Sequence, residues 1–175
     1  MTRAERALAF GFGAAAEFSA ILNFREEVRQ MCRKDTCGRA LPAPAVPPAC
    51  GSLDALSRRA AAFPHGLLVQ TFGALSDPFD LPAALALERE HCLRFSRFVA
   101  QLKERVFAMG AGGCRLCERC TYPDSPCLFP DLAMPSMEAC GLDVGEVCRA
   151  ARLPYSRGEG TVTFTSLILF EGRGE

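Results

Sequence analysis

The stretch TVTFTSLILF, residues 161–170, predicts the fold more firmly than any other part of the chain. β-Branched and aromatic side chains recur throughout it, and such residues favour the extended conformation of a strand. A second apolar run of strand length, GLLVQTF at residues 66–72, predicts a buried strand. Weaker candidates at residues 15–22 and 106–110 bring the expected sheet to about four strands.

Helical patterns alternate with these strands along the chain. Ser52, Asp80 and Asp143 each precede such a pattern as an N-cap residue, whose side-chain oxygen accepts a bond from a backbone N–H of the first turn. The order indicates an α/β or α+β fold, in which helices pack on a small sheet and cysteine-rich loops connect the elements. The predicted helices span residues 4–12, 24–31, 53–63, 81–105 and 144–153, with one helical turn over 134–139.

The longest predicted helix, residues 81–105, carries an apolar stripe that repeats close to the helical period. His91 lies in its charged segment EREHCLRF, so we expect this histidine to be solvated. The stripe consists of Leu81, Leu85, Cys92, Phe95, Val99, Leu102 and Val106. The charged residues expected to face water are Glu88, Arg89, Glu90, Arg94, Arg97 and Lys103.

The totals are those of an ordinary globular protein. The 175 residues fit one domain, residues 1–175, and a chain of this length folds without needing cross-links. Twenty basic residues balance twenty acidic ones, which argues against nucleic acid as a partner because phosphate binding usually requires a basic excess. No apolar run reaches the ~18 residues of a membrane helix. Two glycines and an acidic flank make residues 7–16 a poor signal peptide, so we expect a cytoplasmic protein without membrane contact.

The segment CRLCERCTYPDSPC places four cysteines, Cys114, Cys117, Cys120 and Cys127, within residues 114–127. A C-x2-C spacing directs two thiolates toward one metal centre. A third cysteine, after two more intervening residues, can add a further ligand to the same centre. Such repeated spacings occur in ferredoxin-type iron–sulfur loops, whereas zinc sites more often have two separated C-x2-C pairs. A reducing compartment disfavours disulfides. The pattern therefore favours a [4Fe–4S] cluster, with zinc as the alternative and disulfides or free thiols as the third interpretation.

An iron–sulfur cluster with thiolate ligands needs positive charge and hydrogen-bond donors nearby. Arg115, Arg119 and the backbone amides of residues 110–113 could supply them. The glycines in that segment are equally consistent with a plain turn.

A second group, Cys32, Cys37 and Cys50, has spacings that match no tight metal-binding turn. These cysteines could add a remote ligand to the first group, form half of a second site, or be ordinary loop thiols. We expect structural roles for Cys92 on the long helix, for Cys148 on the helix after Asp143, and for Cys140.

Other catalytic patterns are missing from the sequence. His65 and His91 have no neighbouring serine or cysteine that suggests hydrolysis. The segment GAGG at residues 110–113 departs from G-x-G-x-x-G, because Arg115 stands where the last glycine belongs, and the chain has no P-loop. A conventional hydrolase, kinase or nicotinamide enzyme therefore has no support.

In these motifs the chain resembles the DUF2284 family of predicted metal-binding proteins. The resemblance runs nearly end to end, through VRQMCRKDTCG, PPACGSLDAL, HGLLVQTF, GAGGCRLCERCTYPDSPCLFPDLAMPSMEACGLDV and GTVTFTSLILF. It implies that the single domain binds metal. The family's first cysteine region typically reads C-x4-C-G-x-Y-G-x-x-W-x-C-P-P.

This chain departs from that N-terminal pattern. Cys32, Cys37, Pro47 and Pro48 match it, but Ala40, Pro44 and Val46 stand in place of the tyrosine, the tryptophan and the third cysteine. The resemblance therefore implies an altered N-terminal site, in which Cys50 replaces the missing cysteine or the site is lost.

These observations lead to three functional hypotheses. The first is an iron–sulfur protein that transfers electrons or supports a redox protein partner, with Cys127 or an N-terminal cysteine as the fourth ligand. With only three cysteine ligands, the open iron could bind a substrate, which would make the chain an enzyme. The second is a zinc-stabilised interaction module, and the third is a metal-transfer protein.

Overall fold

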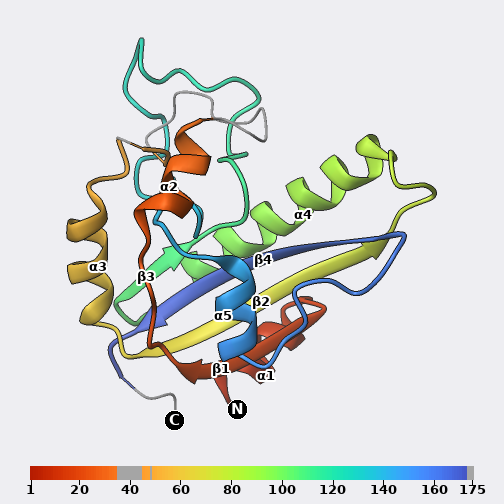
Figure 1. Ribbon diagram of the computed structural model, residues 1–175, viewed down its shortest axis with the longest axis horizontal. Helices are drawn as coiled ribbons and strands as arrows, with labels where there is room; N and C mark the ends of the chain where they lie inside the picture. The colour runs from red at the N-terminus through yellow and green to blue at the C-terminus, as the bar shows by residue number, and fades with distance from the viewer. Residues whose placement is uncertain (35–44, 48, 173–175) are drawn as a thin grey trace.

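The computed structural model describes residues 1–34, 45–47 and 49–172 (Figure 1). Each strand is preceded by at least one helix, and all four named strands join one sheet. The elements are α1 (Arg3–Ala9), β1 (Ala14–Ser19), α2 (Glu26–Arg33), α3 (Leu53–Ala61), β2 (His65–Ala74), α4 (Leu81–Ala100), β3 (Val106–Met109), α5 (Val144–Ala150) and β4 (Thr161–Phe170).

The sheet has the strand order β1-β2-β4-β3, and each neighbouring pair is antiparallel. β4 therefore lies inside the sheet, where Leu68 of β2 pairs with Leu167 and Ala108 of β3 pairs with Ile168. An antiparallel sheet with helices packed on it is an α+β fold, one of the two classes that the sequence predicts.

Helices cover both faces of this sheet. Leu167 and Leu169 pack in a core with α3 and α5, while Ile168 and Phe170 pack in a second core with α1 and α4 (Figure 1). Successive side chains of a strand point to opposite faces, so a strand buried on both faces has no polar alternation. This explains why the end of the stretch at 161–170 reads as a continuous apolar run.

The three predicted N-caps are confirmed. The side chains of Ser52, Asp80 and Asp143 accept hydrogen bonds from backbone N–H groups in the first turns of α3, α4 and α5. The helical turn predicted over residues 134–139 is present but lies two residues later, because the N–H of Cys140 donates to the carbonyl oxygen of Ser136 over 3.1 Å. α5 also ends at Ala150, before the predicted boundary.

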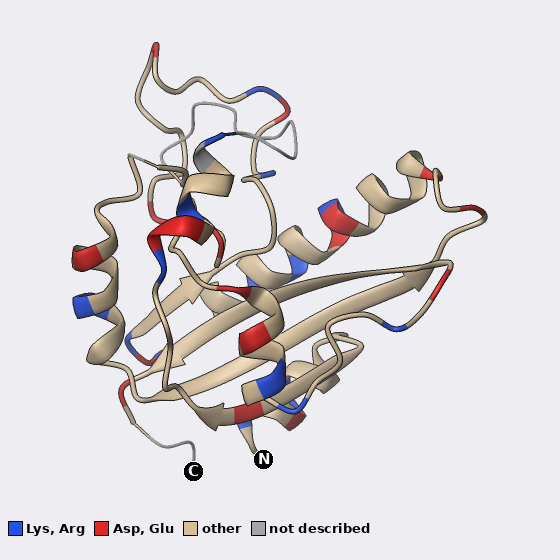
Figure 2. Ribbon diagram, in the orientation of Figure 1, with Lys and Arg blue, Asp and Glu red and all other residues tan. Residues whose placement is uncertain are grey.

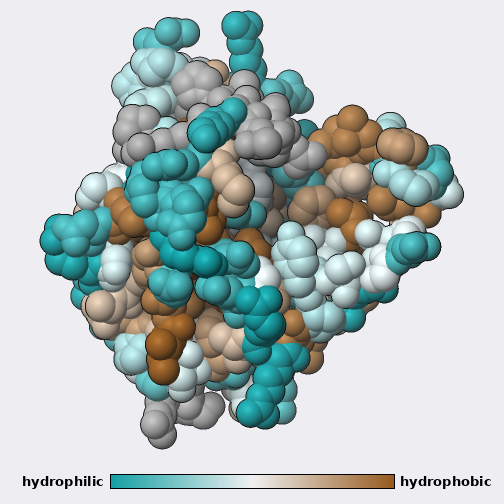
Figure 3. Space-filling model, viewed as in Figure 1, coloured by the Kyte–Doolittle hydropathy of each residue, from teal (hydrophilic) through white to brown (hydrophobic). Residues whose placement is uncertain are grey.

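The orientation and the length of the longest helix differ from the prediction. α4 ends at Ala100, and the residues it buries are Glu88, His91, Phe95 and Phe98. Leu81 and Leu85, expected in the core, are 57% and 38% exposed. The N-terminal half of α4 extends away from the sheet (Figure 1), and hydrophobic side chains gather on this projecting part (Figure 3). The helix therefore buries its apolar face only where the sheet lies beneath it.

His91 is fully buried, so the expectation of a solvated histidine is wrong. Its Nδ1 lies 2.9 Å from the hydroxyl of Thr71 on β2, and its Nε2 lies 2.8 Å from the hydroxyl of Ser166 on β4. Burial, together with the smaller effect of the nearby charge of Arg94, lowers the pKa of His91 to about 3. A neutral imidazole has one donor and one acceptor nitrogen, and hydroxyl groups satisfy both roles. His91 thus links α4 to the two central strands.

Among the residues described here, no helix combines the length and the apolar character that crossing a membrane requires.

Candidate metal centre

The cysteine-rich segment leaves the sheet and returns to it at one point. β3 ends at Met109, and the next residue, Gly110, forms a parallel bridge with Ser136. The N–H of Gly110 donates to the carbonyl oxygen of Pro135 over 2.8 Å. Residues 111–135 therefore form a loop whose two ends meet at the edge strand of the sheet, and we call this segment the cysteine loop.

The N-terminal region is tied to the segment that follows the cysteine loop. Phe24 forms an antiparallel bridge with Leu142, and the N–H of Arg25 donates to the carbonyl oxygen of Gly141 over 2.8 Å. Gly141 has a φ of +88°, and a Cβ there would lie 2.8 Å from the carbonyl oxygen of Arg25. Only glycine meets both conditions without strain. These contacts place α2, with Cys32 near its C-terminal end, at the same end of the molecule as the cysteine loop (Figure 1).

The four cysteines of the loop are half-buried free thiols. Burial raises the pKa of Cys114, a hydrogen bond to the backbone at Leu116 lowers it, and like-charge interactions with Cys117, Cys127 and Cys120 raise it again. The structure therefore brings the other three thiols near enough to Cys114 for their charges to interact. The raised pKa keeps Cys114 a neutral thiol in the metal-free chain, and a metal ion that bound here would displace the proton and stabilise the thiolate.

Within residues 1–34, 45–47 and 49–172, no three His, Cys, Asp or Glu side chains are grouped closely enough to hold a metal ion. What fits a metal centre here is the chemistry of the donors. Four thiols on one short loop form a soft donor set, which selects zinc, copper(I) or iron–sulfur clusters over magnesium or calcium.

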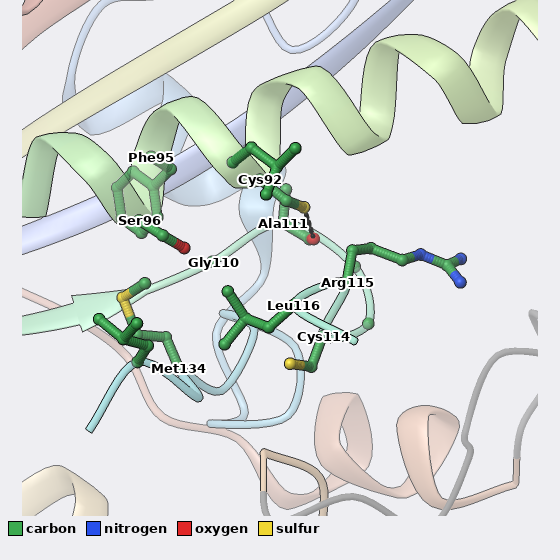
Figure 4. A pocket seen from close by; sticks show the side chains of 13 residues that line it. Cys92, Phe95, Ser96, Gly110, Ala111, Cys114, Arg115, Leu116 and Met134 are labelled. Atoms are coloured by element: carbon green, nitrogen blue, oxygen red, sulfur yellow. Dashed lines mark hydrogen bonds between the residues drawn. The ribbon is translucent and has the colours of Figure 1, made fainter. Parts of the chain in front are cut away.

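Arg115, expected to offset thiolate charge, instead pairs with a carboxylate on α4. Its Nη2 lies 3.2 Å from Oε2 of Glu88, whose side chain is almost completely buried. The Arg115 side chain extends away from the sulfur of Cys114 (Figure 4). The prediction that Glu88 faces water is therefore wrong, because this carboxylate holds the first residue after Cys114. Arg119, the other arginine expected to offset thiolate charge, is exposed.

A pocket of about 30 Å³ lies between α4 and the first part of the cysteine loop (Figure 4). Cys92 from α4 and Cys114 from the loop both line it. The Sγ of Cys92 donates to the carbonyl oxygen of Ala111 over 3.5 Å. This volume suffices for a water molecule or two. Cys92 is half-buried at the candidate site, whereas the sequence predicted a structural thiol in the core.

Of the second cysteine group, Cys37 lies outside the described residues, as do Ala40 and Pro44. Cys50 lies beside the segment after the cysteine loop, where its Sγ donates to the carbonyl oxygen of Ala139 over 3.8 Å. Nη2 of the buried Arg29 lies 3.9 Å from the same sulfur. The structure thus places Cys50 among residues of α2 and the segment around Ala139.

The two cysteines expected in the core are there. Cys140 and Cys148 are fully buried, and burial raises the pKa of both thiols. Cys140 also interacts electrostatically with Cys50. Both residues pack in the core between the sheet, α3 and α5, so the structural interpretation of these two cysteines is confirmed.

A four-stranded antiparallel sheet with helices on both faces and a cysteine loop at one edge defines a cysteine-rich α+β protein. The chain belongs to the DUF2284 family, described as predicted metal-binding proteins, whose family model matches residues 19–170. Comparisons with curated proteins and with solved structures found no match. The family assignment supports metal binding and leaves the metal open.

Glu88 and Cys92 contact the cysteine loop, and sequence reasoning assigned neither of them to the site. The predicted apolar stripe advances by three or four residues at each step, through positions 81, 85, 92, 95, 99 and 102, except between 85 and 92. A residue at position 88 would complete the series. Continuing the period through that position puts residue 88 on the buried face. The periodicity therefore contained the signal, and the negative charge of Glu88 concealed it.

Proposed function

We propose that the cysteine loop binds a [4Fe–4S] cluster through Cys114, Cys117, Cys120 and Cys127, and that the protein transfers electrons or assists a redox enzyme. The observation that carries this proposal is that four half-buried cysteines lie on a single loop, whose two ends are joined at the edge of the sheet by the bridge between Gly110 and Ser136. Membership in a family of predicted metal-binding proteins supports a metal at this site.

The spacing of the cysteines supports iron–sulfur chemistry over zinc. Three cysteines at C-x2-C-x2-C wrap one corner of a cluster, as in ferredoxin-type loops, and Cys127 follows on the same loop. A structural zinc site of the ribbon type would need a second C-x2-C pair further along the chain. When bound, the cluster would accept or donate one electron at a time.

The surroundings of Cys127 support a protein partner for this electron transfer. Leu128 and Phe129 follow it directly and are 61% and 44% exposed. A partner protein can bury exposed apolar side chains of this kind in an interface. An interface next to the cluster would bring the cluster close to the redox centre of the partner. We therefore propose a redox protein partner, and neither nucleic acid nor a membrane.

The experiment that tests the ligand set replaces each cysteine separately by alanine and reconstitutes the cluster anaerobically. We expect Cys114→Ala, Cys117→Ala and Cys120→Ala to lose most of their bound iron. The matched control is Cys148→Ala, since this residue belongs to α5 and its thiol is buried in the core against the sheet. Full iron retention by any one of the three loop variants would contradict the proposal.

The fourth ligand is identified by the same series. We expect Cys127→Ala to lose the cluster, while Cys32→Ala, Cys37→Ala and Cys50→Ala retain it. The reverse pattern would move the fourth ligand to the N-terminal region and leave Cys127 without a role in metal binding.

A further inference from the structure

We propose that Glu88 and Cys92 of α4 are positioning residues for the metal centre, which hold the cysteine loop on both sides of Cys114. This inference rests on the proposed function, because it concerns how the first cysteine ligand is held. The one-turn spacing of the two residues and their separate contacts with the loop carry the argument.

The two contacts bracket Cys114. Glu88 accepts a hydrogen bond from Nη2 of Arg115, the residue directly after Cys114, over 3.2 Å. Cys92 donates to the carbonyl oxygen of Ala111, three residues before it, over 3.5 Å. Residues four apart lie on the same side of a helix. One face of α4 thus contacts the loop at two points, and Cys114 lies between these points in the sequence. The contact of Cys92 with Ala111 is the dashed line in Figure 4.

The contact with Glu88 is strong because the carboxylate is buried. A buried charge that loses one of its partners is destabilising, so Glu88 favours loop conformations that keep Arg115 in place. Arg115 is still 32% exposed. The Cys92 contact involves a weak S–H donor and adds less. The bond between Glu88 and Arg115 is therefore the main attachment.

The helix that makes these two contacts, α4, is itself fixed to the sheet. His91, between Glu88 and Cys92, bonds to both central strands, and Phe95 packs in the core one turn further on. A positioning residue is effective when its own support is rigid, as it is here. The sheet thereby fixes the place of a loop that extends beyond its edge.

Two interpretations of the ion pair predict opposite results. If Glu88 only cancels the charge of Arg115, then Glu88→Gln frees a positive charge beside the thiolates and retains an anionic cluster longer. If Glu88 positions the loop, the same change loosens the loop and shortens retention. The sign of the change therefore separates positioning from charge balance.

The experiment compares Glu88→Gln, Arg115→Met and the double variant with wild type. Residues of both charges lie along α4 (Figure 2). The matched control is Glu90→Gln, since Glu90 is exposed and pairs with Arg94 of the same helix instead of with the cysteine loop. One measurement follows the loss of the reconstituted cluster to an iron chelator. The other follows hydrogen exchange of the amides of residues 111–116 in the metal-free chain.

We expect Glu88→Gln and Arg115→Met each to lose the cluster about 10-fold faster, the effect usual for residues that orient metal ligands. The double variant should be no worse than either single variant, because both changes break one contact. The amides of residues 111–116 should exchange faster in the metal-free variants, and Glu90→Gln should behave as wild type. Cys92→Ala should show a smaller effect in the same direction.

Wild-type or slower cluster loss in Glu88→Gln would overturn the inference, as would unchanged amide exchange. Complete loss of the cluster in Cys92→Ala would also overturn it, because Cys92 would then be a ligand. Failure of the wild-type chain to bind iron would contradict the proposed function, and amide exchange would then still decide whether Glu88 holds the loop.

Discussion

Acid should destabilise this protein through His91, the buried histidine that joins α4 to the sheet. Its pKa is lowered from 6.5 to about 3 in the folded chain. Between these two values the unfolded chain binds a proton that the native chain does not, so the free energy of unfolding falls as the pH falls. From pH 7 to pH 5, His91 should contribute a loss of ~2 kcal/mol, at 1.36 kcal/mol for each pH unit below 6.5.

The variant His91→Gln removes this contribution. It should be less stable than wild type at pH 7 by about 1–3 kcal/mol, because the hydroxyls of Thr71 and Ser166 lose well-placed partners. Its further loss between pH 7 and pH 5 should be smaller than that of wild type by ~2 kcal/mol.

The assay is urea unfolding of the metal-free, reduced chain, followed by far-UV circular dichroism since the sequence has no tryptophan. Phe98→Leu serves as the control, because Phe98 is buried on the same face of α4 and does not titrate. It should lower stability equally at both pH values. If His91→Gln lost as much stability as wild type between pH 7 and pH 5, the reasoning about His91 would be refuted.

Three further predictions concern stability in the same assay. Gly141→Ala should lower the free energy of unfolding by about 2 kcal/mol or more, because it combines backbone strain with a clash against the Arg25 carbonyl. The loss should exceed that of Gly158→Ala, since Gly158 has a similar φ but open space around it. Equal losses in the two variants would argue against the clash. Ile168→Ala should cost about 3 kcal/mol, and an effect below about 1 kcal/mol would contradict its burial on the α4 side of the sheet. Ser52→Ala should cost about 1 kcal/mol through loss of the α3 cap, and no change would refute the capping role.

The sequence predicted the elements that follow from local chemistry. The strand at 161–170 was predicted at its observed bounds, because its side chains favour strand wherever it packs. The N-caps of α3, α4 and α5 were equally predictable, since a side chain bonds to a backbone group three residues away. The antiparallel pairing of β4 with β2 and β3 was not, because sequence periodicity does not specify strand partners.

The errors in α4 have a tertiary origin. Helical periodicity fixes the spacing of the buried face but does not tell how much of the helix the sheet will cover. Leu81 and Leu85 are exposed because the N-terminal half of α4, which carries them, extends away from the sheet. Glu88 and His91 are buried because partners from other segments, Arg115, Thr71 and Ser166, satisfy their polar atoms. Partners so distant in sequence cannot be read from a window around the helix.

The candidate site was predictable only in part for the same reason. The presence of four cysteines on one loop can be read from the sequence, whereas the bridge between Gly110 and Ser136 and the contacts of Glu88 and Cys92 depend on the fold. The sequence could propose Cys50 as an additional ligand, but it could not foresee its place beside Ala139 and Cys140.

The most direct test of the central claim is a metal and sulfide analysis of the protein purified without oxygen, combined with its absorption spectrum. The proposed cluster predicts a brown protein that absorbs near about 400 nm, with about four iron and four acid-labile sulfide per chain. A colourless protein with about one zinc per chain and no labile sulfide would contradict the iron–sulfur assignment.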